Sequence, residues 1–364
     1  MRVLHLPSNI ASYPAHTVRG LRQIGVNAFG LVFSNTPVQS AAGLKVIQTE
    51  PPLKPHGRTL VESLRPVKLY NYAKWSYYYV KWSAWADVVH WYFGTRVLPW
   101  GLDLKYLKAL DKPRVVEWLG SDIRIPEIEF LDNPYYRAAF RSGHRIESMQ
   151  RSRQVQKQFA KAGFATIVPA CMLRYVQRDI CRRVYVVPQR IVLSDYRPAY
   201  PNPETARPVI VHSATDPIIK GTPAVLRAIE QLKTKYNFKF HLIHGIPRNE
   251  ALQLVQRADI FLDQFVMGDH GMAALEAMAY GKPVLCYIKP SMVDQYPRDC
   301  PIINANQDDL AEALKPFLID GELRHEMGKR SRAYVEKYHD AAKLALQLVS
   351  IYHGLIEHRT RDRC

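Results

Sequence analysis

The sequence predicts an α/β fold with two domains, each built on a parallel β-sheet covered by helices. Strand-like apolar runs alternate with helical patterns along the chain, as in parallel sheets with helical crossovers. A segment at residues 195–208, with four prolines, interrupts this alternation and has the composition of a linker. The 364 residues, 47% of them hydrophobic, are sufficient for two cores.

The first half contains six predicted strands and one clear helix. The strands are runs of β-branched and other apolar residues, at residues 2–7, 26–32, 87–91, 113–118, 165–169 and 184–188. The helix at residues 16–23 ends before Gly25, because glycine readily takes the left-handed conformation that closes a helix. Loops after parallel strands are the usual ligand-binding positions of such sheets.

The second half repeats the pattern after the proline-rich segment. Strands are predicted at residues 209–212, 238–243, 260–262 and 284–288, and helices at residues 222–236, 249–257 and 273–280. A final helix is predicted at residues 332–358. Its length exceeds what one small domain requires.

The turn before the helix at residues 273–280 predicts a binding site for a nucleotide diphosphate. Gly268 and Gly271 allow a tight turn and a close approach of the ligand. The free amides of Met272 and Ala273 open a helix whose positive end attracts an anion. Glu276 lies one turn further on, and its carboxylate can accept hydrogen bonds from ribose hydroxyls.

Residues 276–284, Glu-Ala-Met-Ala-Tyr-Gly-Lys-Pro-Val, resemble the donor-binding signature of the retaining GT4-like, or group 1, glycosyltransferases. In that family another glutamate precedes this one by eight positions and touches the donor sugar. Here Gly268 takes its place, followed by Asp269. The resemblance implies the GT-B fold, in which two Rossmann-like domains face each other across a cleft.

The resemblance also implies domain boundaries. Residues 1–197 would form the acceptor domain, completed by a C-terminal helix at about 340–364 that crosses back to it. Residues 198–208 would be the linker, and residues 209–339 the nucleotide-sugar donor domain.

Three further segments match positions of the family's site. Lys220 corresponds to a lysine that binds the donor diphosphate, whereas Ala214 or Thr215 replaces the family's arginine; alternatively, residues 220–221 only start a helix. Asp122 follows the turn where relatives carry a histidine, and could equally cap the next turn. The resemblance assigns catalytic roles to Lys220, Asp122 and Asp269, and donor binding to Ser213, Thr215, Lys220, Gly245, Ile246, Gly271, Met272, Ala273 and Glu276.

The formal charge of +17 is concentrated in one window. Residues 141–190 contain eleven lysines and arginines and two acidic residues, a net charge of 11 − 2 = +9. This density indicates an anionic partner such as a phospholipid surface, a lipid-linked acceptor or nucleic acid. A solvated basic face is the alternative.

Residues 65–85 mix lysines with tyrosines and tryptophans, a composition typical of the membrane interface. The residues predicted to meet a membrane or acceptor are Lys68, Lys74, Trp75, Tyr78, Trp82, Arg151 and Arg153. Alternatively, the aromatics pack between helices, with Leu69, Ala73, Tyr77 and Val80 as a core stripe at helical spacing.

These observations predict a glycosyltransferase that moves a sugar from a nucleotide-sugar donor to a lipid-linked or glycan acceptor in cell-surface polysaccharide synthesis. The resemblance implies a retaining, metal-independent reaction with no cofactor. Five cysteines without CxxC spacing and no apolar run of membrane-spanning length predict a cytoplasmic protein, peripheral at the inner face of the membrane. A non-catalytic GT-B partner in glycan assembly is the alternative; a DNA glycosyltransferase is weaker, because the basic residues form no nucleic-acid motif.

Overall fold

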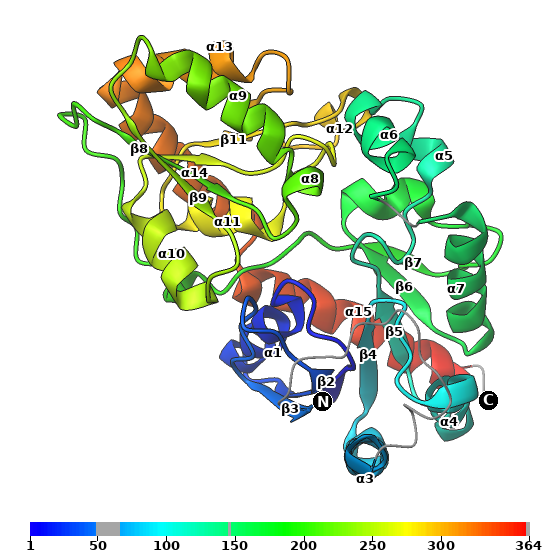
Figure 1. The fold of residues 1–364 in the computed structure, drawn as a ribbon. Helices are drawn as coiled ribbons and strands as arrows, with labels where there is room; N and C mark the ends of the chain where they lie inside the picture. The colour runs from blue at the N-terminus through cyan, green and yellow to red at the C-terminus, as the bar shows by residue number, and fades with distance from the viewer. Residues whose placement is uncertain (49–65, 145–146, 362–364) are drawn as a thin grey trace. The chain divides into compact units, whose positions relative to one another are not determined.

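The computed structural model describes residues 1–48, 66–144 and 147–361, which form two compact units (Figure 1). The first unit comprises residues 1–124, 149–190 and 341–364, and the second comprises residues 125–148 and 191–340. Each unit is a parallel sheet with helices. The predicted α/β class is therefore confirmed.

Seven parallel strands form the sheet of the first unit, in the order β3-β2-β1-β4-β5-β6-β7. They are β1 (Arg2–Leu6), β2 (Asn27–Ser34), β3 (Leu44–Gln48), β4 (Val88–Tyr92), β5 (Arg114–Glu117), β6 (Ala165–Val168) and β7 (Val184–Val186). In the centre of the sheet, Val3 of β1 pairs with Ala28 and Val88. All five residues of β4 are buried, as expected for a central parallel strand covered on both faces.

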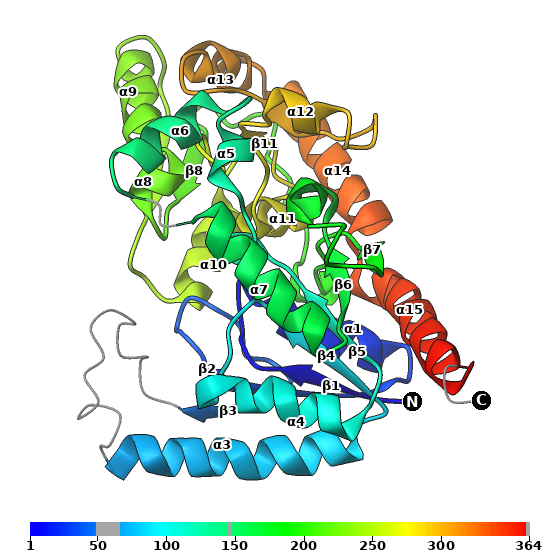
Figure 2. The ribbon, with the colours of Figure 1, turned by 90° about the vertical axis from the view of Figure 1, so that its right-hand side faces the viewer.

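The longer helices of the first unit are α1 (Tyr13–Gln23), α3 (Pro66–Trp85), α4 (Leu102–Leu110), α7 (Met149–Lys161) and α15 (Ala341–Arg361). The helices α1 and α15 share a core in which Leu21 and Tyr352 are fully buried, and they lie side by side in both ribbon views (Figures 1 and 2). A β-carbon on Gly20 would lie 2.5 Å from the carbonyl oxygen of Ala341. Glycine at this position therefore allows the close approach of α15.

A buried polar network joins β4, β5 and α15 within the first unit. His90 Nε2 lies 3.0 Å from Glu117 Oε2, and His90 Nδ1 lies 2.6 Å from the hydroxyl of Tyr352. Arg190 forms an ion pair with the same carboxylate of Glu117, and both side chains are fully buried. Burial lowers the pKa of His90 despite the neighbouring carboxylate. His90 thus has a structural role in the middle of β4.

Five parallel strands form the sheet of the second unit, in the order β12-β11-β10-β8-β9. They are β8 (Val209–Ser213), β9 (Lys239–Ile243), β10 (Ile260–Leu262), β11 (Val284–Cys286) and β12 (Ile303–Asn304). Ile260 of β10 pairs with Ile210 of β8. The helices are α5 (Pro126–Glu129), α6 (Pro134–Arg141), α8 (Pro217–Lys220), α9 (Thr222–Lys233), α10 (Arg248–Arg257), α11 (Met272–Ala279), α12 (Pro290–Val293), α13 (Leu310–Ile319) and α14 (Gly321–Tyr338).

The segment at residues 125–148 is attached to the second unit by a buried ion pair and a hydrogen bond. Glu129 pairs with Lys289, and Asn133 Nδ2 donates to the carbonyl of Val266 at 2.9 Å. These long-range contacts explain why the segment groups with residues 191–340, whereas the sequence-based division assigned it to residues 1–197.

The single helix predicted at residues 332–358 is wrong, because two helices, α14 and α15, occupy this region. The N–H of Ile191 donates to the carbonyl of His339 at 2.8 Å, and Ile191 forms a parallel bridge with Asp340. This pairing holds the backbone at 339–340 outside the helix. The break is also the boundary between the units, and α15 belongs to the first of them.

Candidate functional site

The turn that precedes α11 is shaped by the backbone of Gly268. Its φ of +74° lies in the left-handed region, and a β-carbon there would be 2.8 Å from Cβ of Lys289 and 3.0 Å from Nδ2 of Asn133. A side chain at this position is therefore both strained and obstructed. The local backbone therefore favours glycine at the position where the resembled family has its first glutamate.

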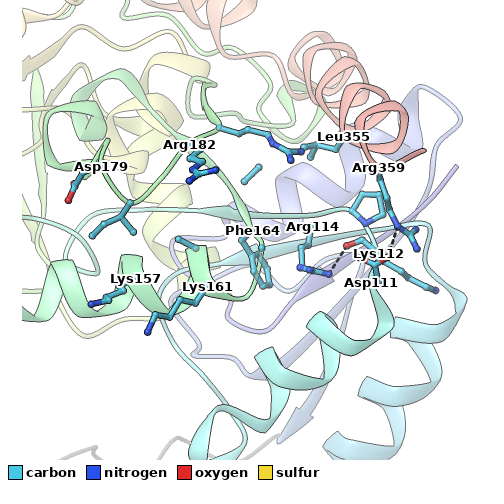
Figure 3. Close-up of a pocket in the computed structure, with 16 residues that line it drawn as sticks. Asp111, Lys112, Arg114, Lys157, Lys161, Phe164, Asp179, Arg182, Leu355 and Arg359 are labelled. Atoms are coloured by element: carbon cyan, nitrogen blue, oxygen red, sulfur yellow. Dashed lines mark hydrogen bonds and ion pairs between the residues drawn. The ribbon is translucent and has the colours of Figure 1, made fainter. Parts of the chain in front are cut away.

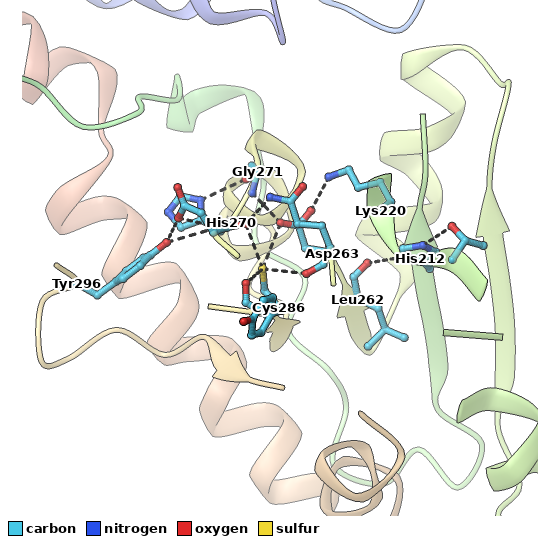
Figure 4. Close-up of polar contacts among 12 residues, drawn as sticks. His212, Lys220, Leu262, Asp263, His270, Gly271, Cys286 and Tyr296 are labelled. Carbon is cyan, nitrogen blue, oxygen red and sulfur yellow. Dashed lines mark hydrogen bonds and ion pairs between the residues drawn. The ribbon is translucent and has the colours of Figure 1, made fainter. Parts of the chain in front are cut away.

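Asp263 connects the predicted lysine to the start of α11 (Figure 4). It follows β10, and its fully buried carboxylate lies 2.9 Å from Nζ of Lys220. Its other oxygen accepts a hydrogen bond of 2.7 Å from the N–H of Gly271, the N-cap of α11. Burial alone would raise the pKa of Asp263, but the Lys220 ammonium and the Gly271 amide outweigh burial and lower it. The carboxylate is thus ionised and fixes the lysine beside the helix.

Lys220 and Gly271 lie close together, as the anion-site prediction requires. A β-carbon on Gly271 would lie 3.2 Å from Nζ of Lys220. Among the described residues, no side-chain bond caps α11 at Gly271, so the amides of Met272 and Ala273 at its first turn remain available to a ligand. The Lys220 side chain retains 15% exposure. A cation and an uncapped helix N-terminus therefore meet at one point.

Glu276 is held by two partners that the sequence analysis missed. Arg248 Nη2 forms an ion pair with its Oε1, and the hydroxyl of Tyr196 lies 3.3 Å from the same oxygen. Arg248 also donates to that hydroxyl at 2.9 Å. Burial opposes the charge of Arg248, yet Glu276 and Tyr196 raise its pKa above the ordinary value.

The loops after β8 and β9 lie side by side. Ser213 pairs with Ile243 in the sheet, and Nδ1 of His244 lies 2.6 Å from the carbonyl of Ala214. Thr215 and Gly245 are exposed, and Ile246 is half-buried. The loop of Gly245 and Ile246 leads directly into Arg248 of α10, which connects it to Glu276. The three donor-site segments of the second unit are thus linked by contacts.

His212 of β8 is hydrogen-bonded to the neighbouring strand β10 and to the start of α9. Its Nδ1 contacts the carbonyl of Leu262 and its Nε2 contacts the hydroxyl of Thr222, both at 2.9 Å. Burial lowers the pKa of His212 to about 4. Because the ring is neutral and a carbonyl only accepts, Nδ1 carries the proton and Nε2 accepts from Thr222.

Both aspartates with predicted catalytic roles take part in local hydrogen bonds. Oδ1 of Asp269 accepts from the hydroxyl of Tyr296 and from the N–H of His270. In the first unit, Oδ1 of Asp122 accepts from the N–H of Gly120 at 2.8 Å. Burial raises the pKa of Asp122 to about 6, with the backbone N–H groups opposing the shift. Asp122 therefore accepts from the backbone of the preceding residues Leu119 and Gly120 and not, among the described residues, from the next turn, which was the alternative considered from sequence.

In α3, the aromatic residues divide into a buried face and an exposed face. Trp75 is fully buried and packs edge-on against Phe33, so it is a core residue and not a surface anchor. Trp82 stacks on Phe29 with ring centroids 3.7 Å apart. Tyr78 is half-buried, with Lys45 Nζ 4.2 Å from its ring.

The exposed face of α3 contains three of the four residues proposed as a core stripe, so that stripe is wrong. Tyr77 is 61% exposed, Val80 is 47% exposed and Ala73 is also exposed. Tyr70 extends the same face with 64% exposure. Half-buried Lys74 lies near Tyr70, with Nζ 5.8 Å from its ring centroid. The side chains of Lys68 and Leu69 lie outside the described residues.

Arg151 and Arg153 are exposed on α7. That helix packs through Phe159 against Trp91 and Trp118, whereas α3 contacts β1, β2 and β3. Arg153 forms an ion pair with Asp179. Of the described helices, none is long and apolar enough to cross a membrane. Among the residues that the structure describes, no group of three or more His, Cys, Asp or Glu side chains could hold a metal ion.

Sequence signals existed for the missed residues, although they were weak. Asp263 follows a predicted strand at its carboxyl end, where ligand-binding side chains gather in parallel sheets. Arg248 lies two positions after Ile246, which was predicted together with Gly245 to bind the donor. Tyr196 lies in the proline-rich segment read as a linker, which carried no signal for a role beside Glu276.

Solved structures of the same architecture define the fold of the protein. A sucrose-phosphate synthase from Thermosynechococcus elongatus has 15% identity and a TM-score of 0.64, and the match covers 98% of this chain and 100% of that one. WaaG, a glycosyltransferase involved in lipopolysaccharide biosynthesis, has 15% identity and a TM-score of 0.56. The match covers 97% of this chain and 100% of WaaG. HepE from Anabaena, solved with UDP and glucose, has 13% identity and a TM-score of 0.53. The match covers 97% of this chain and 100% of HepE. The protein has the GT-B fold, with two Rossmann-like domains.

The family assignment comes from the second unit. Residues 206–334 match the family described as Glycosyl transferases group 1, and no curated protein matches the sequence. The chain carries a group 1 domain within a GT-B fold and is a glycosyltransferase.

Proposed function

We propose that the protein transfers a sugar from a nucleotide-sugar donor to a lipid-linked or glycan acceptor in cell-surface polysaccharide synthesis. The observation that carries the proposal is the position of Lys220 Nζ beside the uncapped start of α11, within the group 1 domain. Structures of HepE, which has the same fold, contain UDP or UDP-glucose. This supports a uridine nucleotide as the first donor to test.

Lys220 and the amides of α11 would bind the donor diphosphate and stabilise the charge that develops as it departs. An ammonium group has three donors, and Asp263 accepts from one of them. The remaining donors and the positive end of the helix act together on an anion. Asp263 is a positioning residue, because it holds both groups without meeting the ligand. Such fixed electrostatic stabilisation is typically the largest contribution to catalysis.

Glu276 would bind the ribose hydroxyls, as the resemblance implies. Arg248 and Tyr196 hold one oxygen of its carboxylate, which leaves the other oxygen to accept from a sugar hydroxyl. We further propose a retaining, metal-independent reaction.

The test is donor hydrolysis and thermal stabilisation across a panel of nucleotide sugars. Lys220→Met should reduce hydrolysis by about 100- to 1,000-fold, the usual cost of losing one stabilising donor at a developing anion. This variant also leaves the buried carboxylate of Asp263 without its cationic partner, which destabilises the fold. The double variant Lys220→Met/Asp263→Asn removes both charges, so it should regain stability and remain inactive.

Lys233→Met is the matched control, because Lys233 is an exposed lysine of α9 that pairs with Glu230. Its activity should equal that of the unmodified protein. A double variant with full activity would contradict the role of Lys220. If no nucleotide sugar in the panel binds, the non-catalytic alternative replaces the proposal.

We also propose peripheral attachment to an anionic membrane through the exposed face of α3. Tyr70 and Tyr77 are the exposed aromatics of that face, and Lys81 beside them is exposed. Tyrosine rings and lysine ammonium groups suit the headgroup layer. The double variant Tyr70→Ser/Tyr77→Ser should lose sedimentation with phosphatidylglycerol vesicles, whereas Leu346→Ser, which changes another exposed apolar residue, should retain it. Equal binding by both variants would refute this attachment.

A further inference from the structure

A basic pocket lies in the first unit, at the edge of the sheet where strands begin (Figure 3). It has a volume of about 750 Å³. Its walls come from the start of β5, the end of α7 with its turn into β6, the loop before β7 and the end of α15. The loop of Asp122 follows the opposite, carboxyl end of β5. The pocket also lies outside residues 206–334, the group 1 domain.

The charge of the lining is strongly unbalanced. Seven of the sixteen lining residues are basic and two are acidic. Both acidic residues already have cationic partners, since Asp111 pairs with Arg359 and Asp179 pairs with Arg153. The lining therefore offers no free carboxylate to neutralise its remaining cations.

Two of the basic residues have a structural explanation. Arg114 donates to the carbonyls of Leu107 and Ala162, at the ends of α4 and α7. Lys112 Nζ donates to the carbonyls of Ser83 and Ala86, at the end of α3. Cations in these positions satisfy helix C-termini.

Four other basic residues have no such explanation. Lys157 and Lys161 project from α7 (Figure 3). Arg182 and Arg183 come from the loop before β7. All four are exposed, and among the described residues none of their side chains has an ion-pair or hydrogen-bond partner. Repulsion among like charges disfavours such a group unless an anion joins it.

We infer that this pocket is a binding site for a compact phosphate-bearing anion with more than one negative charge, such as a diphosphate group. Arginine guanidinium groups match phosphate oxygens in a bidentate way, and lysines add point charges. The geometry pairs these two residue types from separate elements around one cavity. The diphosphate can belong to a soluble molecule or to a lipid headgroup.

The test measures binding of inorganic pyrophosphate to the full chain by calorimetry at low salt. Arg182→Gln/Arg183→Gln should weaken binding by about tenfold or more, because each charged hydrogen bond contributes substantially to affinity. Both side chains are exposed, so the variant should fold normally. The matched control is Lys105→Gln/Lys108→Gln, which removes two exposed charges from α4 outside the pocket.

Loss of binding in the arginine variant but not in the control supports the inference. Equal weakening in both variants, or no binding by the unmodified protein, would overturn it. So would loss of binding confined to Lys220→Met/Asp263→Asn, because the pyrophosphate would then occupy the donor site. Binding of DNA without binding of pyrophosphate would also overturn it.

A second measurement identifies the source of the anion. Vesicles of phosphatidylcholine with and without phosphatidic acid are sedimented with each variant. Arginine-dependent sedimentation that pyrophosphate competes away supports the site with a lipid phosphate as ligand. Arginine-dependent binding of pyrophosphate alone supports the site with a soluble ligand.

Discussion

Restoring a side chain at position 268 should destabilise the second unit by more than backbone strain alone. The φ of Gly268 is +74°, and the left-handed conformation costs a residue with a β-carbon roughly 1–2 kcal/mol. The β-carbon would also lie 2.8 Å from Lys289 and 3.0 Å from Asn133. Overpacking of this kind costs roughly 1–3 kcal/mol. Gly268→Ala should therefore lower the free energy of unfolding by about 2–5 kcal/mol.

The neighbours of Gly268 cannot move away cheaply, because each is held by other contacts. Lys289 pairs with Glu129, and Asn133 donates to the carbonyl of Val266. Gly245 provides the matched control: its φ is +70°, but nothing lies within 4 Å of an added β-carbon. Gly245→Ala should cost only the backbone term, about 1–2 kcal/mol.

The two units need separate probes. All six tryptophans belong to the first unit, so their fluorescence follows that unit. Hydrogen exchange of peptides from α9 and α11 reports the opening free energy of the second unit. If Gly268→Ala is no more destabilising than Gly245→Ala, crowding at this turn is refuted. Gly268→Glu would then be a realistic way to restore the family's first glutamate.

Four other variants test the remaining structural reasoning. Because the native pKa of Asp122 is raised to about 6, its contribution to stability is present at low pH and is lost as pH rises from about 4 to 6. The stability difference between the unmodified protein and Asp122→Asn should therefore change by roughly 3 kcal/mol in urea titrations across that range, and a flat difference would contradict the raised pKa. For His212, the native pKa of about 4 means that the stability of the second unit falls as pH drops from about 6.5 to 4, by up to roughly 3 kcal/mol. Hydrogen exchange should show this pH dependence in the unmodified protein and not in His212→Asn. Gly20→Ala should destabilise the first unit, because its β-carbon would lie 2.5 Å from the carbonyl oxygen of Ala341. The overpacking costs roughly 1–3 kcal/mol, and the higher helix propensity of alanine offsets part of that cost. Gly354→Ala in α15, with open space around it, should instead stabilise that unit by about 1 kcal/mol; similar tryptophan-fluorescence transitions for these two variants would argue against the close helix contact.

The sequence alone determined the class and the alternation of strands and helices, and it predicted the central residues of the candidate donor site. These follow from local signals: apolar runs, glycines that permit turns, and a helix N-terminus beside a lysine. Gly271, Lys220 and Glu276 were predicted in this way, because Gly271 starts α11, Glu276 lies one turn inside it and Lys220 directly precedes the glycine before α9.

Only the tertiary structure decided how the charges of that site are paired and which surfaces remain exposed. Asp263 and Lys220 are 43 positions apart, and Arg248 and Glu276 are 28 positions apart. The helical periodicity of α3 did not reveal which aromatic face would meet the sheet; Trp75 was buried and Tyr77 left exposed. The break between α14 and α15 depends on a strand-like contact with Ile191, far away in sequence. Local propensity carries no information about such partners, because their energies arise only when folding brings distant segments together.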